Sequence, residues 1–147
     1  MFKKILVPLD GSSFSEEALP HARELAECGN AEIILARVDE PYEPPPGVFV
    51  PATAIPEAVQ LSAGEYLEQL VSRLTLAGFK VSSAVLDGKV SEALLRFAKN
   101  EGVDLIVMST HGRTGLSRLL MGSIAEQVVH GAHCPVLLVR PQERGAT

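Results

Sequence analysis

Short runs of apolar residues alternate with longer amphipathic stretches along nearly the whole chain. Five apolar runs have the length of buried strands, and we place strands at 5–7, 33–38, 79–86, 104–108 and 135–139. Between them, apolar residues at helical spacing predict helices over 14–28, 57–77, 90–100 and 123–130. Strands that alternate with helices imply right-handed βαβ units, and therefore a parallel sheet with helices packed against it.

Capping residues and prolines set the expected ends of these elements. Ser13 with Glu16 predicts a capping box for the first helix, and Gly29 predicts its end. Pro20 lies inside that helix, so it predicts either a kink or a later helix start. The proline-rich segment 39–56 is expected to form a long loop without a regular element.

The length of 147 residues suits one domain over 1–147, and a hydrophobic content of 46% excludes intrinsic disorder. The formal net charge of −5 argues against a general nucleic-acid binder. Cys28 and Cys134 form neither a disulfide framework nor a CxxC pair, which indicates a reducing compartment. No apolar run is long enough for a signal peptide or a membrane helix, so we expect a cytoplasmic protein without membrane insertion.

Two loops carry the residues best suited to ligand chemistry, and each follows a predicted strand. They are 7–12, after the first strand, and 108–115, which follows the fourth and leads to Gly122-Ser123. Ligands of doubly wound sheets bind at the carboxyl ends of the strands, where the strand order reverses. If the order is 3-2-1-4-5, the reversal lies between the first and fourth strands, and both loops face one crevice.

The charges near this crevice suit an anion. Segment 105–125 contains no Asp or Glu but does contain Arg113 and Arg118. The amides of Gly122 and Ser123, at a predicted helix N-terminus, favour bound phosphate. Asp10 on the facing loop is suited to accept hydrogen bonds from a base or ribose, or to help hold a metal ion on phosphates. The alternative is that the glycines only form turns and that Asp10 only begins a helix cap, and these residues alone leave both open.

At these residues the chain resembles the universal stress protein family. The similarity is carried by Val7-Pro8-Leu9-Asp10-Gly11-Ser12, by the run from Met108 to Leu116, and by Gly122-Ser123, and it continues through 134–139. It implies a five-stranded parallel sheet in the order 3-2-1-4-5 with helices on both faces. That fold is the Rossmann-like one of the adenine nucleotide alpha hydrolases. The resemblance also implies homodimers and, in one branch, ATP binding.

The ATP-binding branch carries Gly-x-x-Gly, nine residues, and then Gly-Ser or Gly-Thr. Gly112, the nine residues 113–121 and Gly122-Ser123 match this pattern, whereas Ser109 stands where the first glycine is expected. We expect this departure to weaken nucleotide binding rather than abolish it. The resemblance implies that ATP, with Mg²⁺ or Mn²⁺ on its phosphates, contacts Pro8, Leu9, Asp10, Val38, Met108, Ser109, His111, Gly112, Arg113, Gly122, Ser123 and Ile124.

Three functions are compatible with this pattern. The first is an ATP-binding stress or signalling regulator with unknown protein partners, and at most a slow ATPase or autophosphorylation activity. The second is a nucleotide-hydrolysing enzyme, for which His111 is the only candidate base. The third is a dimeric interaction protein of the same fold with an empty crevice.

Two other groups of residues resemble functional sites but lack a part that such a site needs. His130, His133 and Cys134 lie close in sequence but lack a fourth ligand, so we expect no metal centre. A triad of Asp10, Ser109 and His111 lacks the G-x-S-x-G turn, so we assign no catalytic residue.

The fifth predicted strand indicates a homodimer. In the order 3-2-1-4-5, segments 79–86 and 135–139 are the two edge strands. The first alternates polar with apolar residues, as an edge strand does, whereas 135–139 is uniformly apolar. We therefore expect a second copy to cover it, with the two strands antiparallel about a two-fold axis.

Overall fold

The computed structural model describes residues 1–39, 46–54, 61–112 and 121–142. Its centre is a five-stranded parallel sheet in the order β3-β2-β1-β4-β5, which confirms the predicted sheet and its order. The strands are β1 (Lys4–Pro8), β2 (Glu32–Val38), β3 (Lys80–Leu86), β4 (Leu105–Ser109) and β5 (Val136–Val139). All five fall where the apolar runs predict them, and β3 and β5 form the two edges.

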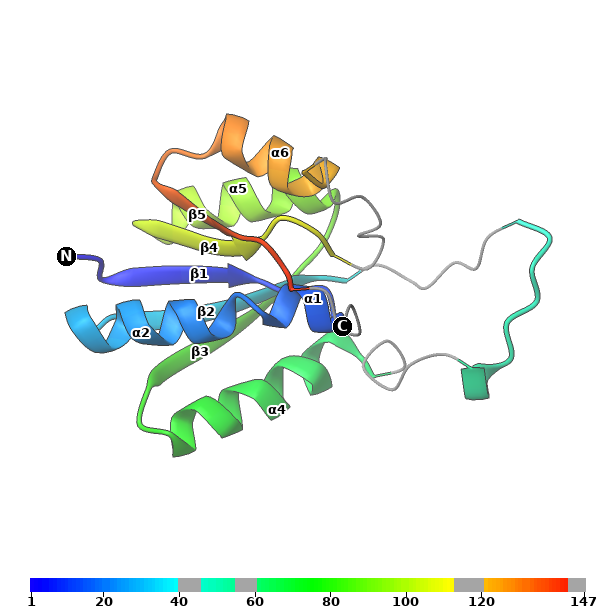
Figure 1. The fold of residues 1–147 in the computed structure, drawn as a ribbon, viewed down its shortest axis with the longest axis horizontal. Helices are drawn as coiled ribbons and strands as arrows, with labels where there is room; N and C mark the ends of the chain where they lie inside the picture. Colours follow the sequence, from blue (N-terminus) through cyan, green and yellow to red (C-terminus); the bar gives the residue numbers. More distant parts are fainter. Residues whose placement is uncertain (40–45, 55–60, 113–120, 143–147) are drawn as a thin grey trace.

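Helices cover both faces of this sheet (Figure 1). On one face lie α2 (Leu19–Gly29), which follows the single-turn helix α1 (Ser13–Glu16), and α4 (Ala63–Leu76). On the other face lie α5 (Val90–Asn100) and α6 (Ser123–Gly131). Among the residues described, no helix has the length and apolar composition needed to cross a membrane.

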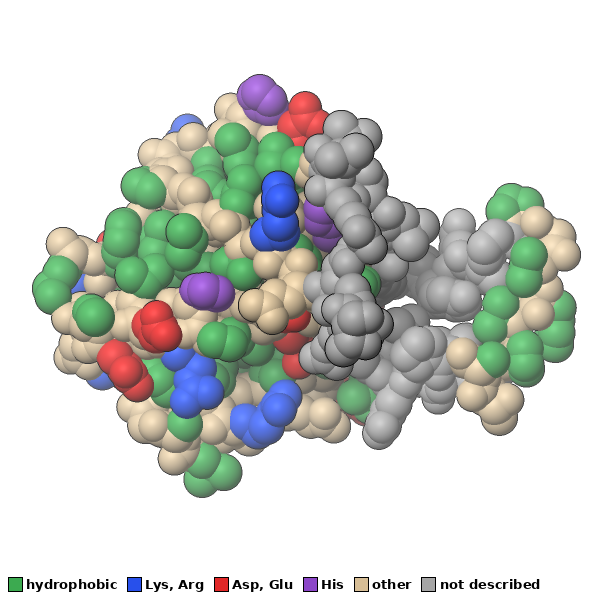
Figure 2. Space-filling model, viewed as in Figure 1, with side chains coloured by type: hydrophobic (Ala, Val, Ile, Leu, Met, Phe, Trp, Pro, Cys, Tyr) green, Lys and Arg blue, Asp and Glu red, His purple; other side chains and the backbone are tan. Residues whose placement is uncertain are grey.

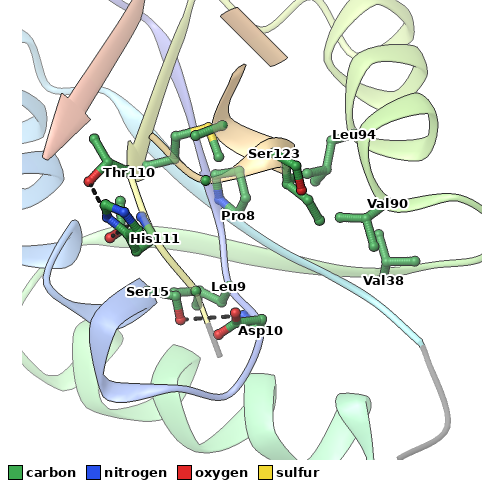
Figure 3. A pocket seen from close by; sticks show the side chains of 16 residues that line it. Pro8, Leu9, Asp10, Ser15, Val38, Val90, Leu94, Thr110, His111 and Ser123 are labelled. Carbon is green, nitrogen blue, oxygen red and sulfur yellow. Dashed lines mark hydrogen bonds between the residues drawn. The ribbon is translucent and has the colours of Figure 1, made fainter. Parts of the chain in front are cut away.

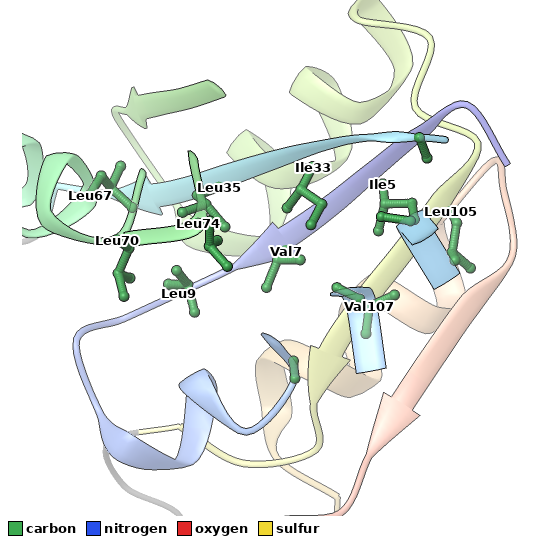
Figure 4. Close-up of a cluster of buried hydrophobic side chains, with 14 of the residues drawn as sticks. Ile5, Val7, Leu9, Ile33, Leu35, Leu67, Leu70, Leu74, Leu105 and Val107 are labelled. Atoms are coloured by element: carbon green, nitrogen blue, oxygen red, sulfur yellow. The ribbon is translucent and has the colours of Figure 1, made fainter. Parts of the chain in front are cut away.

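The core has two layers, one on each face of the sheet. Ile5, Val7 and Ile33 point toward α2 and α4, as the cluster in Figure 4 shows. Their neighbours Leu6 and Ile34 point to the opposite face, toward α5 and α6. Side chains of successive strand residues alternate between the faces, so strands buried on both sides need continuous apolar runs. This explains why the runs were the strongest signal in the sequence.

The helix predicted over 14–28 is instead two helices. Glu17 and Ala18 keep right-handed helical dihedral angles, but their N–H groups bond to the carbonyls of Phe14 and Ser15, three residues back, which ends α1. Helix α2 begins at Leu19 with Pro20 in its first turn. Proline is tolerated there because the first N–H groups of a helix have no partner within it. Of the two outcomes predicted from Pro20, the later start is therefore confirmed. The predicted capping box of Ser13 and Glu16 is wrong, because Ser12 is the N-cap of α1 and its side chain accepts from the N–H of Ser15.

The second predicted helix begins later than expected. The prediction placed its start at 57, but α4 begins at Ala63, where Ser62 and Glu65 form a reciprocal capping box. Residues 57–60 lie outside the described part of the chain. The prediction that 39–56 holds no regular element is also wrong in one place, since η1 (Ala52–Ala54) is a single 3-10 turn closed by a bond from the Ala54 N–H to the Pro51 carbonyl.

The strand order leaves a crevice at the carboxyl edge of the sheet. β1 is paired on both sides, with Ile5 opposite Ile33 of β2 and opposite Leu105 of β4. Chain connections leave β1 and β4 toward opposite faces of the sheet, so the loops after these two strands separate and leave a crevice between them.

Candidate functional site

A cavity of about 350 Å³ lies at the carboxyl ends of β1, β2 and β4. Every predicted site residue that the structure describes lines it, namely Pro8, Leu9, Asp10, Val38, Met108, Ser109, His111, Gly112, Gly122, Ser123 and Ile124. Arg113, the remaining predicted residue, lies outside the described residues. The loops after β1 and β4 therefore face one crevice, as their sequence positions predicted.

Hydrogen bonds to Ser12 and Ser15 hold Asp10 in place. Its Oδ1 accepts from the N–H of Ser12 at 2.9 Å and from the hydroxyl of Ser12 at 2.6 Å. The N–H of Asp10 in turn donates to Ser15 Oγ at 3.3 Å (Figure 3). An ionised carboxylate only accepts hydrogen bonds, so this loop presents a fixed acceptor to the crevice.

Gly112 brings the loop after β4 directly against that carboxylate. A Cβ atom at position 112 would overlap Oδ2 of Asp10. Gly112 is not among the glycines with positive φ, so the requirement for glycine comes from this close approach rather than from a turn.

Gly122 closes the other end of the same loop, in a way the sequence did not predict. We expected its amide to be available to an anion, but the Gly122 N–H donates to the carbonyl oxygen of Thr110 at 2.8 Å. The first backbone bond of α6 runs from the Glu126 N–H to the Gly122 carbonyl. The amides of Ser123, Ile124 and Ala125 therefore form the first turn, whose N–H groups α6 does not use internally.

The N-terminus of α6 still favours anions, although the Gly122 amide is bonded to Thr110. Gly122 is its N-cap and makes no side-chain cap bond. First-turn amides and the positive end of the helix dipole both favour negative charge. Of the two amides expected to bind phosphate, that of Gly122 is bonded to Thr110, and Ser123 with the residues that follow it remains the candidate position.

Ser109, the departure from the family pattern, bonds to its own loop. Its Oγ accepts from the His111 N–H at 3.2 Å, and the residue is 6% exposed. The hydroxyl of Thr110 lies 2.9 Å from Nδ1 of His111 and holds the imidazole at the cavity wall (Figure 3). The Ser109 hydroxyl therefore accepts a hydrogen bond from the His111 N–H, which a glycine at 109 would leave available to another acceptor.

Apolar side chains line another side of the cavity, and sequence reasoning found only part of this wall. Val38 of β2 lies beside Val90 and Leu94 of α5 (Figure 3). The lining residues that were missed are Ser15, Val90, Leu94 and Ala125. The first turn of α5 follows β3 and must therefore lie at the same edge of the sheet, which is the signal that could have indicated Val90 and Leu94.

Glu16, the last residue of α1, ties the Asp10 loop to α4. The Tyr66 hydroxyl donates to Glu16 Oε2 at 2.9 Å, and the Arg73 guanidinium lies 3.9 Å from Oε1. Burial raises the pKa of the Tyr66 phenol, and the nearby Glu16 carboxylate raises that pKa further. The guanidinium of Arg37 in β2 stacks over the Tyr66 ring, with its Cζ 4.9 Å from the ring centre.

A second hollow, of about 260 Å³, lies between α2 and α4 and is separate from the crevice. Leu19 and Leu70 form part of its apolar lining, and Arg23 and Arg73 contribute its positive charges. It shares no lining residue with the crevice, so it provides an independent reference surface for binding experiments.

Comparison with known proteins identifies a family over nearly the whole chain. The sequence model of the universal stress protein family matches residues 1–140. A universal stress protein of Methanocaldococcus jannaschii is 36% identical over 148 residues, which cover 98% of this chain and 85% of that protein.

Solved structures agree with this result. The structure of the hypothetical protein MJ0577 superposes with a TM-score of 0.78 at 30% identity and covers 98% of this chain and 99% of its own. A universal stress protein in complex with cAMP has a TM-score of 0.69 at 24% identity, over 96% of this chain and 98% of that one. A family protein from Arabidopsis thaliana with AMP bound has a TM-score of 0.68 at 15% identity, over 99% and 96%. The last two, at these identities, show that the fold is shared.

Proposed function

Because this chain belongs to the universal stress protein family, we propose that the crevice between β1 and β4 binds an adenine nucleotide, ATP in particular. The observation that carries the proposal is the chemistry of this one cavity, which has a carboxylate acceptor, an apolar wall and a helix N-terminus. Concave sites of about 300 Å³ or more, mostly apolar with a few placed polar groups, are typical of small-molecule binding. The cAMP and AMP held by two solved proteins of the same fold support this choice of ligand.

The base lies at the apolar wall in this proposal. Val38, Val90 and Leu94 offer a surface for a planar ring. The carboxylate of Asp10 accepts a hydrogen bond from the exocyclic amino group of adenine or from a ribose hydroxyl. Guanine carries an oxygen where adenine carries that amino group, and two acceptors repel each other, so the site is expected to prefer adenine.

The phosphates lie at the first turn of α6, with the amides of Ser123 to Ala125 and the Ser123 hydroxyl as donors. Asp10 is the only acidic residue among the described residues that line the cavity. A Mg²⁺ or Mn²⁺ ion would therefore be held mainly by the phosphate oxygens and by water, which is how Mg²⁺ is commonly bound with nucleotides. Arg113 is proposed as a further phosphate contact from its place in the sequence motif.

The biological role we propose is a cytoplasmic regulator whose nucleotide occupancy changes the surface around the crevice. The change expected in 39–56 falls partly outside the described residues, at 40–45 and 55–56. His111 is the only imidazole among the described residues lining the cavity, and its Nδ1 already lies against the Thr110 hydroxyl. A site with this single candidate base supports at most slow turnover, so regulation rather than fast catalysis is the proposed outcome.

The regulator is proposed to be a homodimer joined through β5. The Pro135 carbonyl accepts from the Ile106 N–H of β4, and the Val139 carbonyl accepts from the N–H of Thr110, just after β4. In the alternating pattern of a parallel pair, Val136 and Leu138 therefore turn their backbone polar groups to the open edge. Hydrophobic side chains gather over the position of β5 (Figure 2), where Leu137 is 38% exposed. A second β5 would satisfy those polar groups and cover this apolar surface.

Two measurements on the natively purified protein test the nucleotide proposal. Denaturing mass spectrometry should detect an adenine nucleotide released from the protein, and calorimetry on the stripped protein should show saturable binding of ATP. GTP should bind at least about tenfold more weakly, which corresponds to about 1.4 kcal/mol. Absence of both a released nucleotide and a binding signal would favour the interaction protein with an empty crevice.

A further inference from the structure

Ser12 and Ser15 form a closed set of hydrogen bonds around Asp10. The Ser12 hydroxyl donates to Asp10 Oδ1 at 2.6 Å and accepts from the Ser15 N–H at 3.1 Å. The Ser15 hydroxyl donates to the Ser12 carbonyl at 2.9 Å and accepts from the Asp10 N–H at 3.3 Å. Each hydroxyl therefore donates once and accepts once, and its orientation is fixed by its partners.

The Asp10 carboxylate is constrained from two sides as a result. Ser12 supplies both donors to Oδ1, one from its backbone and one from its side chain. On the other side Gly112 approaches Oδ2 so closely that a Cβ would overlap it. A carboxylate held in this way does not have to be ordered when a ligand binds, and such preorganisation increases affinity.

Helix α1 gives this arrangement a rigid base. Ser12 is the N-cap of α1, and Ser15 within it is 5% exposed. At its other end α1 is fixed to α4 by the bond from Tyr66 to Glu16. A displacement of α1 would break bonds at both ends, so the loop that carries Asp10 is tied to the packed helices.

We propose that Ser12 is a positioning residue of the nucleotide site, which orients the Asp10 carboxylate so that it accepts a hydrogen bond from the bound nucleotide. The proposal rests on the proposed nucleotide function and extends it to a residue that does not line the cavity. Ser12 acts through Asp10, so its effect on binding requires the carboxylate to be present.

Substitutions at position 12 separate this role from helix capping. Ser12→Ala removes both the cap and the hydroxyl donor. Ser12→Asp keeps a good N-cap acceptor for the Ser15 N–H but removes the donor and places a second negative charge beside Asp10. Ser12→Thr keeps both the cap and the donor. Ser13→Ala, at the exposed first residue of α1, is the matched control.

Affinity for ATP by calorimetry and melting temperature are measured for each variant. Ser12→Ala is expected to weaken ATP binding by about tenfold, the effect of one hydrogen bond to a charged group. Ser12→Asp should weaken it at least as much, although it keeps the N-cap acceptor of α1. Ser12→Thr should restore binding, and Ser13→Ala should leave it unchanged. Wild-type affinity in both Ser12→Ala and Ser12→Asp would overturn the proposal while leaving the nucleotide function in place.

A double-mutant cycle with Asp10→Asn tests the route of action. Ser12→Ala should produce no further loss of affinity in the Asp10→Asn background, although its effect on melting temperature should persist. Equal losses of affinity in both backgrounds would show that Ser12 does not act through Asp10, and would overturn the proposal.

A measurement without nucleotide distinguishes failure of the positioning role from failure of the proposed function. Three-bond couplings from NMR report the rotamer populations of Asp10. They should show a single χ1 rotamer in the wild type and averaging in Ser12→Ala. A single rotamer in both proteins would overturn the positioning role, whether or not ATP binds.

Discussion

The amide of Gly122 donates a hydrogen bond of 2.8 Å to the carbonyl oxygen of Thr110, across the segment that joins β4 to α6. This bond fixes the two ends of the segment relative to each other. It also sets where α6 begins, and therefore where its first-turn amides lie relative to Asp10 on the facing loop. The shape of the proposed phosphate site thus depends on two backbone groups that are twelve positions apart in the sequence.

Gly122→Val is expected to abolish nucleotide binding. A Cβ at position 122 would lie 2.7 Å from the Thr110 carbonyl oxygen, so the 2.8 Å bond must break and the start of α6 must move. Calorimetry with ATP measures the effect. Gly64→Val in the first turn of α4 is the control, because a Cβ there meets nothing within 4 Å. Unchanged ATP affinity in Gly122→Val would contradict the placement of the phosphates.

Gly112→Ala is expected to reduce ATP affinity by more than about tenfold, or 1.4 kcal/mol. The added methyl group would overlap Oδ2 of Asp10 and force the carboxylate or the loop after β4 to move. Gly64→Ala should bind ATP as the wild type does. If both variants bind ATP equally well, the contact between Gly112 and Asp10 has no role in binding.

Ser109→Gly is expected to tighten ATP binding by about threefold. It releases the His111 N–H from Ser109 Oγ, and a charge-assisted hydrogen bond from that amide to a phosphate is stronger than the bond it replaces. Ser109→Ala frees the same amide but keeps a Cβ, so comparing the two variants by calorimetry separates the amide from backbone access. A clear loss of affinity in both would mean that the Ser109 hydroxyl bonds the nucleotide directly.

Tyr66→Phe is expected to lower the free energy of unfolding by about 2 kcal/mol, the value of a hydrogen bond to a charged group. The phenol donates to Glu16 and is buried, so its pKa is raised in the folded protein. The stability from the protonated phenol is thus fully present below the ordinary tyrosine value of about 10, and decreases as pH rises above it.

Denaturant unfolding between pH 8 and 11, about one to two units on either side of that value, measures both effects. The difference in unfolding free energy between the wild type and Tyr66→Phe should narrow as the pH exceeds about 10. Lysines also titrate in this range, but they are common to both proteins and cancel in the difference. A difference that stays constant with pH would show that the phenol proton is not involved.

Leu137→Lys is expected to convert a dimer into a monomer. Leu137 is 38% exposed in the single chain, so a lysine keeps the fold, but a charge in the β5 contact would be desolvated against its symmetry mate. Leu76→Lys is the matched control, because Leu76 is 90% exposed at the end of α4, which packs beside the opposite edge strand, β3. Sedimentation should report a dimer for the wild type and Leu76→Lys at micromolar concentration. A monomeric wild type would remove the basis of this prediction.

The strands were predictable because each buried strand needs an apolar run that few other elements show. Their order was predicted from the resemblance to the universal stress protein family, and not from the runs themselves. The two site loops were predictable for a related reason, since a reversal in strand order places the loops after β1 and β4 together. Local signals were less decisive, since the proline at 20 predicted either a kink or a later helix start. In the structure Ser12 is the N-cap of α1, and Pro20 lies in the first turn of α2, so the later start is the one observed.

The remaining features depend on contacts between distant segments. The bond from Gly122 to Thr110 exists only once β4 and α6 are packed, so no local pattern marks the Gly122 amide as occupied. The position of α5 after β3 indicated which end of the helix lies at the crevice, but not that Val90 and Leu94 are the side chains that line it. The late start of α4 is different, because the sequence itself carries the capping signal of Ser62 and Glu65 within the segment whose periodicity predicted a helix over 57–77.

A map of NMR amide shifts on titration with ATP tests most directly whether the nucleotide binds in the crevice between β1 and β4. Saturable changes are predicted at Val38, at Ser109 to Gly112 and at Ser123 to Ala125, with little change at Arg23 and Arg73 in the hollow between α2 and α4. Changes confined to that second hollow, or no saturable change at all, would show that no adenine nucleotide binds in the crevice between β1 and β4.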